Sequence, residues 1–178
     1  GGSFDPIHKA HLKLAAAALR QLKLDRVYLI VSPLSPFKLG RQLAPPRVRL
    51  RLVKAAIRGE KGLQAADWEL KRGGPSFTIR TVTAYRRKHP GHDLFLILGT
   101  DALRGFPRWQ RANDLARQVT LVGGLRPGAA WPRLPARLGA SVVRLRGTFP
   151  DVSSTEIRAR LSTGKAAPLL PKPVLHLI

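Results

Sequence analysis

The chain has 178 residues, enough for one globular domain with a sizeable core, and 44% of them are hydrophobic. The absence of cysteine excludes disulfides, thiolate metal sites and cysteine nucleophiles. Lysine and arginine number 32 against 10 aspartate and glutamate, a formal net charge of +22, which leaves nucleic acid, membrane surfaces and phosphorylated small molecules open as partners.

Two of these partner classes are not expected on closer reading. No apolar run approaches the roughly 18 residues that a membrane span needs, and nothing at the start of the chain resembles a signal peptide. We therefore expect no membrane partner and a cytoplasmic location. The basic residues are spread along the whole chain and form no compact tract, so we do not expect a nucleic-acid partner either.

The hydrophobic pattern predicts helices and strands in alternation. In the first half it predicts a helix over 9–23, a buried strand over 27–31, a loop rich in Pro and Gly over 34–46, a helix over about 46–58 and a strand over about 65–70. In the second half it predicts a helix capped by Ser76 and ending near 88, strands over 93–99, 119–124 and 141–147, and a last helix that begins with a Ser153/Glu156 capping box. Apolar strands that alternate with helices are typical of a parallel sheet covered on both faces. We expect one doubly wound α/β domain over 1–178.

The chain begins with GGSFDPIHKAH, in which His8 and His11 lie three residues apart at the start of the first predicted helix. Small residues such as Gly2 let a phosphate approach the backbone, and the helix N-terminus offers free N–H groups and a positive dipole end. At this spacing the two imidazoles share one face and can donate to the same anion. A helix cap with two incidental histidines is the alternative. A glycine pair in this fold class should follow a strand, so we expect one before Gly1.

The last predicted helix offers a second anion site. Ser153, Ser154 and Thr155 supply hydroxyls and free amides at its start, and Arg158 adds a forked cation on the first turn. A capping box without any ligand is the alternative reading. Ligands of open α/β sheets bind outside the carboxyl ends of the strands, where loops lead into helices of this kind.

A third segment, LGTDAL, follows the predicted strand over 93–99. Gly99 ends that strand and would let a flat ring lie on the backbone, while Asp101 could accept from ribose hydroxyls. Trp109 could stack on an aromatic base. A core tryptophan and a helix-capping aspartate are the alternatives.

Together these segments resemble the bacterial nicotinate-nucleotide adenylyltransferases, members of the HxGH nucleotidyltransferase superfamily. GGSFDPIHKAH resembles the family's phosphate loop, and VSSTEIR resembles its I-S-S-T-x-I-R motif. ELKRGGPSFTIRTV (69–82) resembles its nicotinate-side signature, and GTDALRGFPRW (99–109) its G-x-D-x-L-x-x-F-x-x-W motif. The resemblance implies a Rossmann-like sheet of the nucleotidyltransferase type. It also implies that the adenylyl group of ATP is transferred to nicotinate mononucleotide, giving nicotinate adenine dinucleotide and pyrophosphate in NAD biosynthesis.

The resemblance further implies a role for each matching residue. The residues expected to be catalytic are His8, His11 and Arg158. Those expected to bind ATP are Gly2, Ser3, Phe4, His8, His11, Gly99, Asp101, Ser153, Ser154, Thr155 and Arg158. Those expected to bind the second substrate are Lys38, Thr78, Trp109 and Arg126. Mg²⁺ is expected to be held mainly by the phosphates of ATP, so no protein ligand is assigned to it.

Three positions depart from the family pattern: Ala10 replaces a glycine, Phe77 a tyrosine and Phe37 a histidine. Two alternative functions also stay open. A related transferase could use nicotinamide mononucleotide or phosphopantetheine as its acceptor, although the GPSF and FPRW segments argue against phosphopantetheine. The chain could instead be a basic module that binds nucleic acid.

Overall fold

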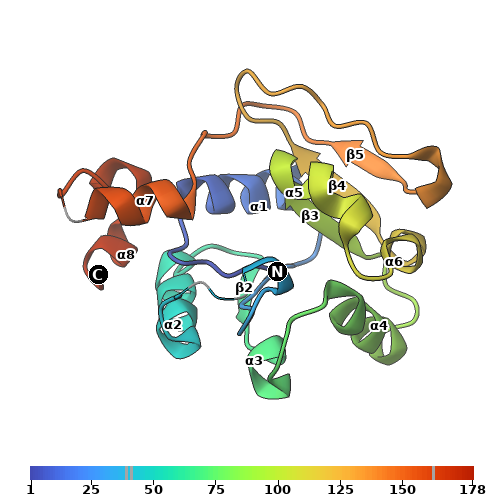
Figure 1. Ribbon diagram of the computed structural model, residues 1–178, viewed down its shortest axis with the longest axis horizontal. Helices are drawn as coiled ribbons and strands as arrows, with labels where there is room; N and C mark the ends of the chain where they lie inside the picture. Colours follow the sequence, from blue (N-terminus) through green and yellow to red (C-terminus); the bar gives the residue numbers. More distant parts are fainter. Residues whose placement is uncertain (39, 41, 162) are drawn as a thin grey trace. The chain divides into compact units, whose positions relative to one another are not determined.

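The computed structural model describes residues 1–38, 40, 42–161 and 163–178. The chain forms two compact units, one of residues Gly1–Ser76 together with Pro150–Ile178, and one of residues Phe77–Phe149 (Figure 1). Strand pairing in the described part of the chain is parallel, and helices alternate with strands, so the predicted α/β class is confirmed. No helix within these described ranges is long and apolar enough to cross a membrane. The expectation of a single domain stays a prediction.

The first unit is built on a pair of parallel strands. Its elements are α1 (Lys9–Gln21), β1 (Val27–Ile30), the 3-10 helix η1 (Pro36–Lys38), α2 (Pro46–Ala56), β2 (Leu63–Ala66), α3 (Trp68–Arg72), α7 (Ser154–Leu161), the 3-10 helix η4 (Ala167–Leu169) and α8 (Lys172–Leu175). β1 pairs with β2, and Gly2 adds a parallel bridge to Val31 at the end of β1. α2 packs against both β2 and α8.

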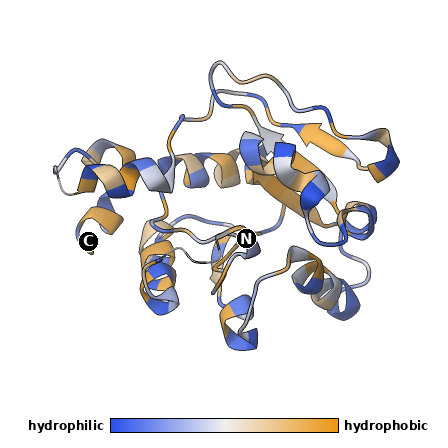
Figure 2. Cartoon of the chain, viewed as in Figure 1, coloured by the Kyte–Doolittle hydropathy of each residue, from blue (hydrophilic) through white to orange (hydrophobic). Residues whose placement is uncertain are grey.

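The second unit is built on a three-stranded parallel sheet in the order β3-β4-β5. Its elements are α4 (Thr78–Lys88), β3 (Phe95–Gly99), α5 (Thr100–Gly105), the 3-10 helix η2 (Phe106–Arg108), α6 (Ala112–Gln118), β4 (Thr120–Gly124), the 3-10 helix η3 (Ala136–Leu138) and β5 (Val142–Arg144). β3 is largely hydrophobic (Figure 2), and Leu103, Phe106, Leu115 and the β4 residue Leu121 are fully buried. Gly99 and Gly124 are register partners at the carboxyl ends of β3 and β4.

Two local predictions are wrong. The strand expected over about 65–70 lies at Leu63–Ala66, because Trp68 already begins α3. Strong helix signals explain this, since Lys71 pairs with Asp67 one turn earlier at 3.2 Å and Gly73 ends the helix with φ +71°. The second error concerns Ser76, which does not cap α4.

Phe77 occupies the N-cap position of α4 without a side-chain hydrogen bond. The backbone N–H of Ser76 donates to the carbonyl of Leu34 at 2.8 Å, next to the bridge between Leu34 and Pro75. Ser76 is therefore held in an extended pairing one residue before the cap, so its hydroxyl does not serve the helix.

Candidate active site

His8 and His11 lie at the start of α1, with His8 at the N-cap. Their rings are stacked, with centroids 3.6 Å apart and planes 23° apart. His8 is buried, at 4% exposure, whereas His11 is half-buried. The structure thus brings the two imidazoles together as the spacing predicts, and His11 is the more accessible of the two.

One hydrogen bond determines which nitrogen of His11 carries the proton. The backbone N–H of His8 donates to Nδ1 of His11 at 3.3 Å. Nδ1 accepts only when it is unprotonated, so the proton of the neutral ring lies on Nε2. The ring of Phe4 meets that of His11 edge-on, with centroids 5.1 Å apart. His11 is therefore held as a ring whose Nε2–H is its donor group.

The glycine-rich loop before α1 is anchored to the end of β1. The N–H of Gly2 donates to Ile30, and the carbonyl of Gly2 accepts from Ser32, both at 2.9 Å. Phe4 follows with φ +47°, the left-handed region that few bulky residues adopt. A Cβ on Gly2 would lie 3.4 Å from the Phe4 ring. Ser3 and Phe4 are both buried, so their side chains shape the loop from inside.

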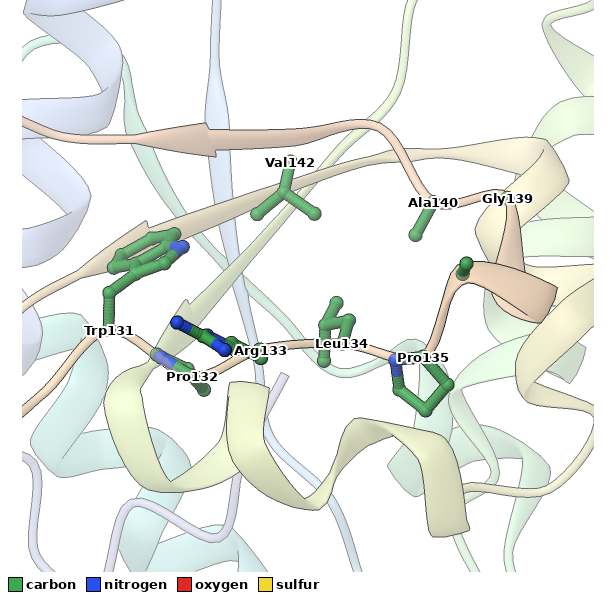
Figure 3. A pocket seen from close by; sticks show the side chains of 9 residues that line it. Trp131, Pro132, Arg133, Leu134, Pro135, Gly139, Ala140 and Val142 are labelled. Atoms are coloured by element: carbon green, nitrogen blue, oxygen red, sulfur yellow. The ribbon is translucent and has the colours of Figure 1, made fainter.

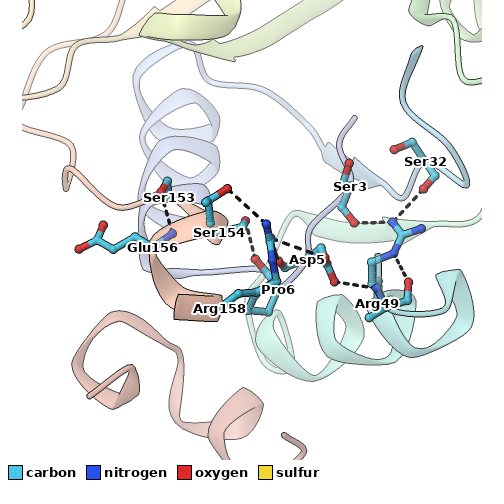
Figure 4. Close-up of polar contacts among 11 residues, drawn as sticks. Ser3, Asp5, Pro6, Ser32, Arg49, Ser153, Ser154, Glu156 and Arg158 are labelled. Atoms are coloured by element: carbon cyan, nitrogen blue, oxygen red, sulfur yellow. Dashed lines mark hydrogen bonds and ion pairs between the residues drawn. The ribbon is translucent and has the colours of Figure 1, made fainter. Parts of the chain in front are cut away.

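Arg49 is a buried residue beside the histidine loop that the sequence analysis missed. It lies on the buried face of α2 with 0% exposure (Figure 4). Its guanidinium donates to the carbonyls of Ser3 at 2.5 Å, Ser32 at 2.8 Å, Pro33 at 3.1 Å and Ala44 at 2.8 Å. One side chain thereby ties the loop before α1 to the segments that follow β1 and precede α2.

The signal for Arg49 is present in the sequence. Arg49, Leu52, Val53 and Ala56 share one helical face by their spacing, and a charged residue among apolar ones needs buried partners. Burial lowers the pKa of the Arg49 guanidinium, and the charge of the nearby Asp5 carboxylate partly offsets this.

Arg158 reaches from α7 to the same loop. Its Nη1 donates to the backbone carbonyl of Asp5 at 2.6 Å and lies 3.5 Å from the Asp5 carboxylate, while Nη2 donates to Oγ1 of Thr155 at 3.3 Å (Figure 4). The side chain of Arg158 remains 36% exposed, and that of Asp5 only 5%. The structure therefore brings Arg158 to the loop that carries the two histidines, as predicted for an anion site.

The hydroxyls at the start of α7 have separate tasks. Oγ of Ser153 accepts the N–H of Glu156 at 3.1 Å, which is the Ser153 half of the predicted capping box. The Glu156 carboxylate forms an ion pair with Arg160 at 2.7 Å, so among the described residues the reciprocal half of the box is not formed. Oγ of Ser154 donates to the carbonyl of Pro6 at 3.0 Å and so fastens α7 to the histidine loop. Thr155 is the exposed member of the trio.

The second unit gathers predicted residues at the carboxyl ends of β3 and β4. Oγ1 of Thr100 donates to the carbonyl of Gly124 at 3.0 Å and accepts the N–H of Arg126 at 3.3 Å. The Arg126 guanidinium lies 3.4 Å from the exposed Asp101 carboxylate, which also pairs with Arg104 at 3.4 Å. Asp101 and Arg126 were assigned to different substrates, yet they form one ion pair here.

Gly99 leaves room above the backbone at this sheet edge. A Cβ built on Gly99 would meet no atom within 4 Å, and its φ of −70° is open to any residue. Packing therefore does not require a glycine at this position. Open space over the peptide is what a flat ligand ring would need, as the sequence predicts.

Thr78 and Trp109 also lie in the second unit. Thr78 is the first residue of α4, and its backbone N–H belongs to the turn that has no acceptor inside the helix. Trp109 ends η2, half-buried against Phe106 with ring centroids 5.6 Å apart. Its backbone N–H donates to Phe106 at 2.9 Å, so that donor is already used. The Arg80 guanidinium lies over the Phe77 ring at 5.1 Å.

A cavity of about 460 Å³ in the second unit contains none of the predicted site residues. It is lined by residues 131–136 with Gly139, Ala140 and Val142 (Figure 3). The Trp131 ring packs so closely on Gly123 that a Cβ there would come within 2.6 Å of it. The cavity therefore gives no support to any of the predicted roles.

The structure does not test two further expectations, the phosphate contact of Lys38 and the binding of Mg²⁺ by ATP. Lys38 ends η1, but its side chain lies outside the described part of the chain. The described residues include no group of three or more His, Asp or Glu side chains placed to hold a metal ion. The expectation that Mg²⁺ is held by ATP phosphates is not tested by this observation.

Comparison with known proteins identifies the family. The cytidylyltransferase-like family model matches residues 1–160. A protein of Bordetella petrii named "Probable nicotinate-nucleotide adenylyltransferase" is 40% identical over 186 residues, covering 100% of this chain and 93% of that protein. A Clostridium tetani protein of the same name is 33% identical, with the same coverage of both chains.

Solved structures share the fold at lower identity. The Plasmodium falciparum nicotinic acid mononucleotide adenylyltransferase, complexed with NaAD, matches with a TM-score of 0.77 at 14% identity, over 99% of this chain and 91% of that one. A Vibrio parahaemolyticus structure described as a "Putative Nicotinate-nucleotide Adenylyltransferase" matches with a TM-score of 0.67 at 20% identity, over 99% of this chain and 94% of that one. Given the family model and the relatives that align over its full length, this chain belongs to the nicotinate-nucleotide adenylyltransferases of the cytidylyltransferase-like family.

Proposed function

We propose that this chain transfers the adenylyl group of ATP to nicotinate mononucleotide, giving nicotinate adenine dinucleotide and pyrophosphate. Besides family membership, one observation carries the proposal: the stacked pair of His8 and His11 directly follows an anchored loop, and the guanidinium of Arg158 reaches Asp5 of that loop from α7. Imidazole donors, a helix N-terminus and an arginine fork make a site for a polyphosphate.

In this reaction the protein has to position the two substrates and neutralise charge, and little else. A phosphate oxygen of the mononucleotide forms the new bond to the α-phosphorus of ATP, and the bond from that phosphorus to the bridging oxygen of pyrophosphate breaks. The attacking oxygen is already ionised at neutral pH, so neither a general base nor a protein nucleophile is needed. In-line placement and neutralisation of the charge that develops on the departing pyrophosphate remain to be supplied.

The first unit supplies the triphosphate contacts in this proposal. His11 donates from Nε2–H to the phosphate oxygens, because its Nδ1 is occupied by the His8 backbone. His8 supports it through the stacked ring, and Arg158 holds the β- and γ-phosphates from α7. Gly2, Ser3 and Phe4 contribute the loop backbone. Ser153, Ser154 and Thr155 present the start of α7, and Lys38 is a further phosphate contact.

The proposed nucleoside contacts are those that the sequence motifs of residues 69–82 and 99–109, with Arg126, imply. Gly99 takes the adenine ring over its backbone, and Asp101 accepts from ribose hydroxyls. Trp109 stacks on the pyridine ring, and the N–H of Thr78 meets the nicotinate carboxylate. Arg126 contacts the second nucleotide, while its ion pair with Asp101 fixes its direction.

The ATP phosphates would hold Mg²⁺, which would neutralise part of their negative charge. A cytoplasmic location and the absence of a membrane partner stay predictions.

The test is a pyrophosphate-release assay with ATP and a panel of acceptors. We expect rapid release with nicotinate mononucleotide and slow release with nicotinamide mononucleotide or phosphopantetheine, and nicotinate adenine dinucleotide should be identified as the product by mass. Faster release with phosphopantetheine would contradict the proposal. Equal release with the two pyridine mononucleotides would reduce it to a pyridine-nucleotide adenylyltransferase.

A further inference from the structure

Helix α2 presents a row of basic side chains on its exposed face. The row consists of Arg47, Arg51 and Lys54, with Arg58 in the turn that follows the helix, and we call it the α2 basic row. The spacing of four, three and four residues places these positions within a narrow arc of one helical face, over a length of about 16 Å. All four residues are exposed, whereas the opposite face of α2 is buried against β2 and α8.

Among the residues that the structure describes, these cations have no acidic partner, in contrast to several other exposed cations of the chain. Lys71, Arg111, Arg117 and Arg160 each form an ion pair with an aspartate or glutamate. None of the four residues of the α2 basic row forms an ion pair or side-chain hydrogen bond within the described ranges. The sequence contains no acidic residue at all from position 26 to 59. The row is therefore a surface of uncompensated positive charge.

Helix stability does not explain this arrangement. Like charges three or four residues apart repel one another along a helix. Arg47 also lies in the first turn, where the helix dipole disfavours a cation and where α2 has no acidic residue. A general preference for surface arginine accounts for the number of cations, but it does not account for a row without any acid.

We propose that the α2 basic row is a docking surface for the phosphate backbone of double-stranded nucleic acid. A straight row of three arginines and one lysine is the electrostatic footprint expected for a regular line of phosphates, and arginine binds phosphate with a planar fork. The surface reads no sequence, because the contacts go to the backbone alone. This activity is separate from adenylyl transfer.

Two other polyanions fit the row less well. A helix that binds a membrane surface does so by burying an apolar face in the lipid, but the apolar face of α2 is already packed against β2 and α8. A single strand is normally held by aromatic side chains on which its bases stack, and α2 contains none. The expectation that nucleic acid is not a partner weighed only the spread of cations along the chain, not their alignment on one helix.

The test measures how salt affects binding of a fluorescent duplex DNA of about 20 base pairs and mixed sequence, by anisotropy, without ATP or mononucleotide. Each phosphate contact contributes about 0.9 to the slope of log K against log salt concentration. We expect the R47Q/R51Q/K54Q/R58Q variant to lose about 3 to 4 from that slope. Between about 50 and 200 mM salt this corresponds to roughly 100-fold less loss of affinity than in the unmodified chain.

A matched control removes the same charge elsewhere. The R87Q/K88Q/R133Q/R137Q variant loses four exposed cations from the second unit and should keep the slope within about 1. The double variant R51Q/K54Q, which removes only two of the four charges, should lose about 2 from the slope of log K against log salt concentration. Both α2 variants should retain adenylyl transfer, which shows that they are folded.

Three results would overturn the proposal. The first is an equal loss of slope in the α2 variant and the control, which would assign binding to net charge. The second is no binding of the duplex by the unmodified chain at about 50 mM salt. The third is row-dependent binding to vesicles of anionic lipid that is tighter than binding to the duplex.

Discussion

At the scale of single residues, the imidazole of His11 has two nitrogens with different tasks. Nδ1 accepts from the backbone of His8 at 3.3 Å, which leaves Nε2–H as the proposed donor to the phosphates. We expect His11→Ala to lower kcat by roughly 10²–10³, the scale of losing one donor that acts in the transition state. KM for the mononucleotide should change much less, because the contact strengthens as charge develops.

The variant His11→Asn tests the two roles of His11 separately: acceptance of the His8 backbone N–H by Nδ1, and donation from Nε2–H to phosphate. The short amide can still accept from the His8 N–H, but it does not reach the position of Nε2. We therefore expect this variant to keep the thermal stability of the parent chain and to lose kcat as the alanine variant does. If His8→Ala and His11→Ala both retained near-normal kcat, the histidine pair would be structural.

Arg158 is proposed to hold the β- and γ-phosphates, so its substitution should weaken the binding of ATP but not that of AMP. Arg158→Ala should weaken ATP binding by about 10–100-fold, the range of a charge-assisted hydrogen bond, with AMP binding nearly unchanged. The variant Arg158→Lys should keep only part of the ATP affinity, because lysine lacks the forked guanidinium. Arg160→Ala is the control on the same helix, since Arg160 pairs with Glu156. Equal losses for ATP and AMP, measured by calorimetry, would move Arg158 away from the pyrophosphate.

Gly99 and Gly123 make a matched pair for testing the open space at the sheet edge. A methyl group on Gly99 would meet no protein atom, whereas one on Gly123 would come within 2.6 Å of Trp131 and 2.9 Å of Leu103. Gly99→Ala should therefore leave the free energy of unfolding unchanged or raise it by up to about 1 kcal/mol. Gly123→Ala should lower it by about 1–3 kcal/mol through overpacking.

For ATP binding we expect the opposite ranking: Gly99→Ala, the more stable variant, should be the one that is impaired. If adenine lies on the Gly99 backbone, the new methyl occupies its place, and KM for ATP should rise about tenfold or more, the effect of one badly placed methyl group. The destabilised Gly123→Ala variant should keep KM near that of the parent while it remains folded. An unchanged KM in Gly99→Ala would show that no ligand lies there.

The site could be predicted from the sequence where residues lie close together along it. His8 and His11 are one helical turn apart, and Ser153 with Glu156 forms the expected cap, so spacing alone places them. Arg49 could not be placed in this way, because its four carbonyl partners come from three separate segments. Only the fold brings those segments together.

At the scale of secondary-structure elements, local signals determined which predictions were correct. The helix and strand patterns of α1, β1 and α2 are long and regular, and their predicted bounds are within two residues of the observed ones. The error near β2 arose because only Asp67 separates this strand from the short helix α3. Charges at i and i+4 and a glycine at the helix end mark the helix, so the strand ends before it.

The first turn of α6 gives a prediction about pH. A hydrogen bond from the side chain of Arg111 holds the pKa of Asp114 below its usual range, and the charges of Arg111 and Arg117 act in the same direction. A carboxyl whose pKa is lower in the folded state stabilises the fold above its unfolded pKa, and this contribution is lost as the pH falls through the folded value. Asp114→Asn should therefore lower Tm near pH 7.

The Tm difference between the parent and Asp114→Asn should shrink as the pH falls below about 4, the ordinary pKa of aspartate, and vanish once the carboxyl is protonated. Thermal melts across this range provide the measurement. A difference that is constant with pH would assign the effect of the substitution to helix propensity instead of the ion pairs.

At the scale of the whole molecule, the alternation of apolar strands and helices was sufficient to predict an α/β fold of parallel strands. The assignment of strands to sheets was not predictable in the same way. Runs such as 27–31 and 93–99 have the same apolar character, so the sequence of a run does not indicate which other strand it pairs with. The pairing of β1 with β2, and of β4 with both β3 and β5, depends on long-range packing.

The net charge of +22 bears on the choice of acceptor. Nicotinate mononucleotide carries one more negative charge than the nicotinamide form, so the long-range field of a strongly basic protein favours it at low salt. A local donor site favours it for another reason. The N–H of Thr78 lies at the N-terminus of α4, where a carboxylate can accept, whereas an amide can set donor against donor.

Salt separates these two explanations. An unpaired buried donor costs about 1–3 kcal/mol, and the lost charge assistance adds to it, so we expect kcat/KM for nicotinate mononucleotide to exceed that of the nicotinamide form by about 10²–10⁴. If the local site dominates, the ratio should change little as salt rises, because contacts at hydrogen-bond distance are screened less than the field between distant charges. Trp109→Ala should impair both acceptors alike, since stacking does not distinguish the rings. A ratio that collapses in high salt would assign the selectivity to the charge of the whole molecule, and a ratio near one would contradict acid selectivity altogether.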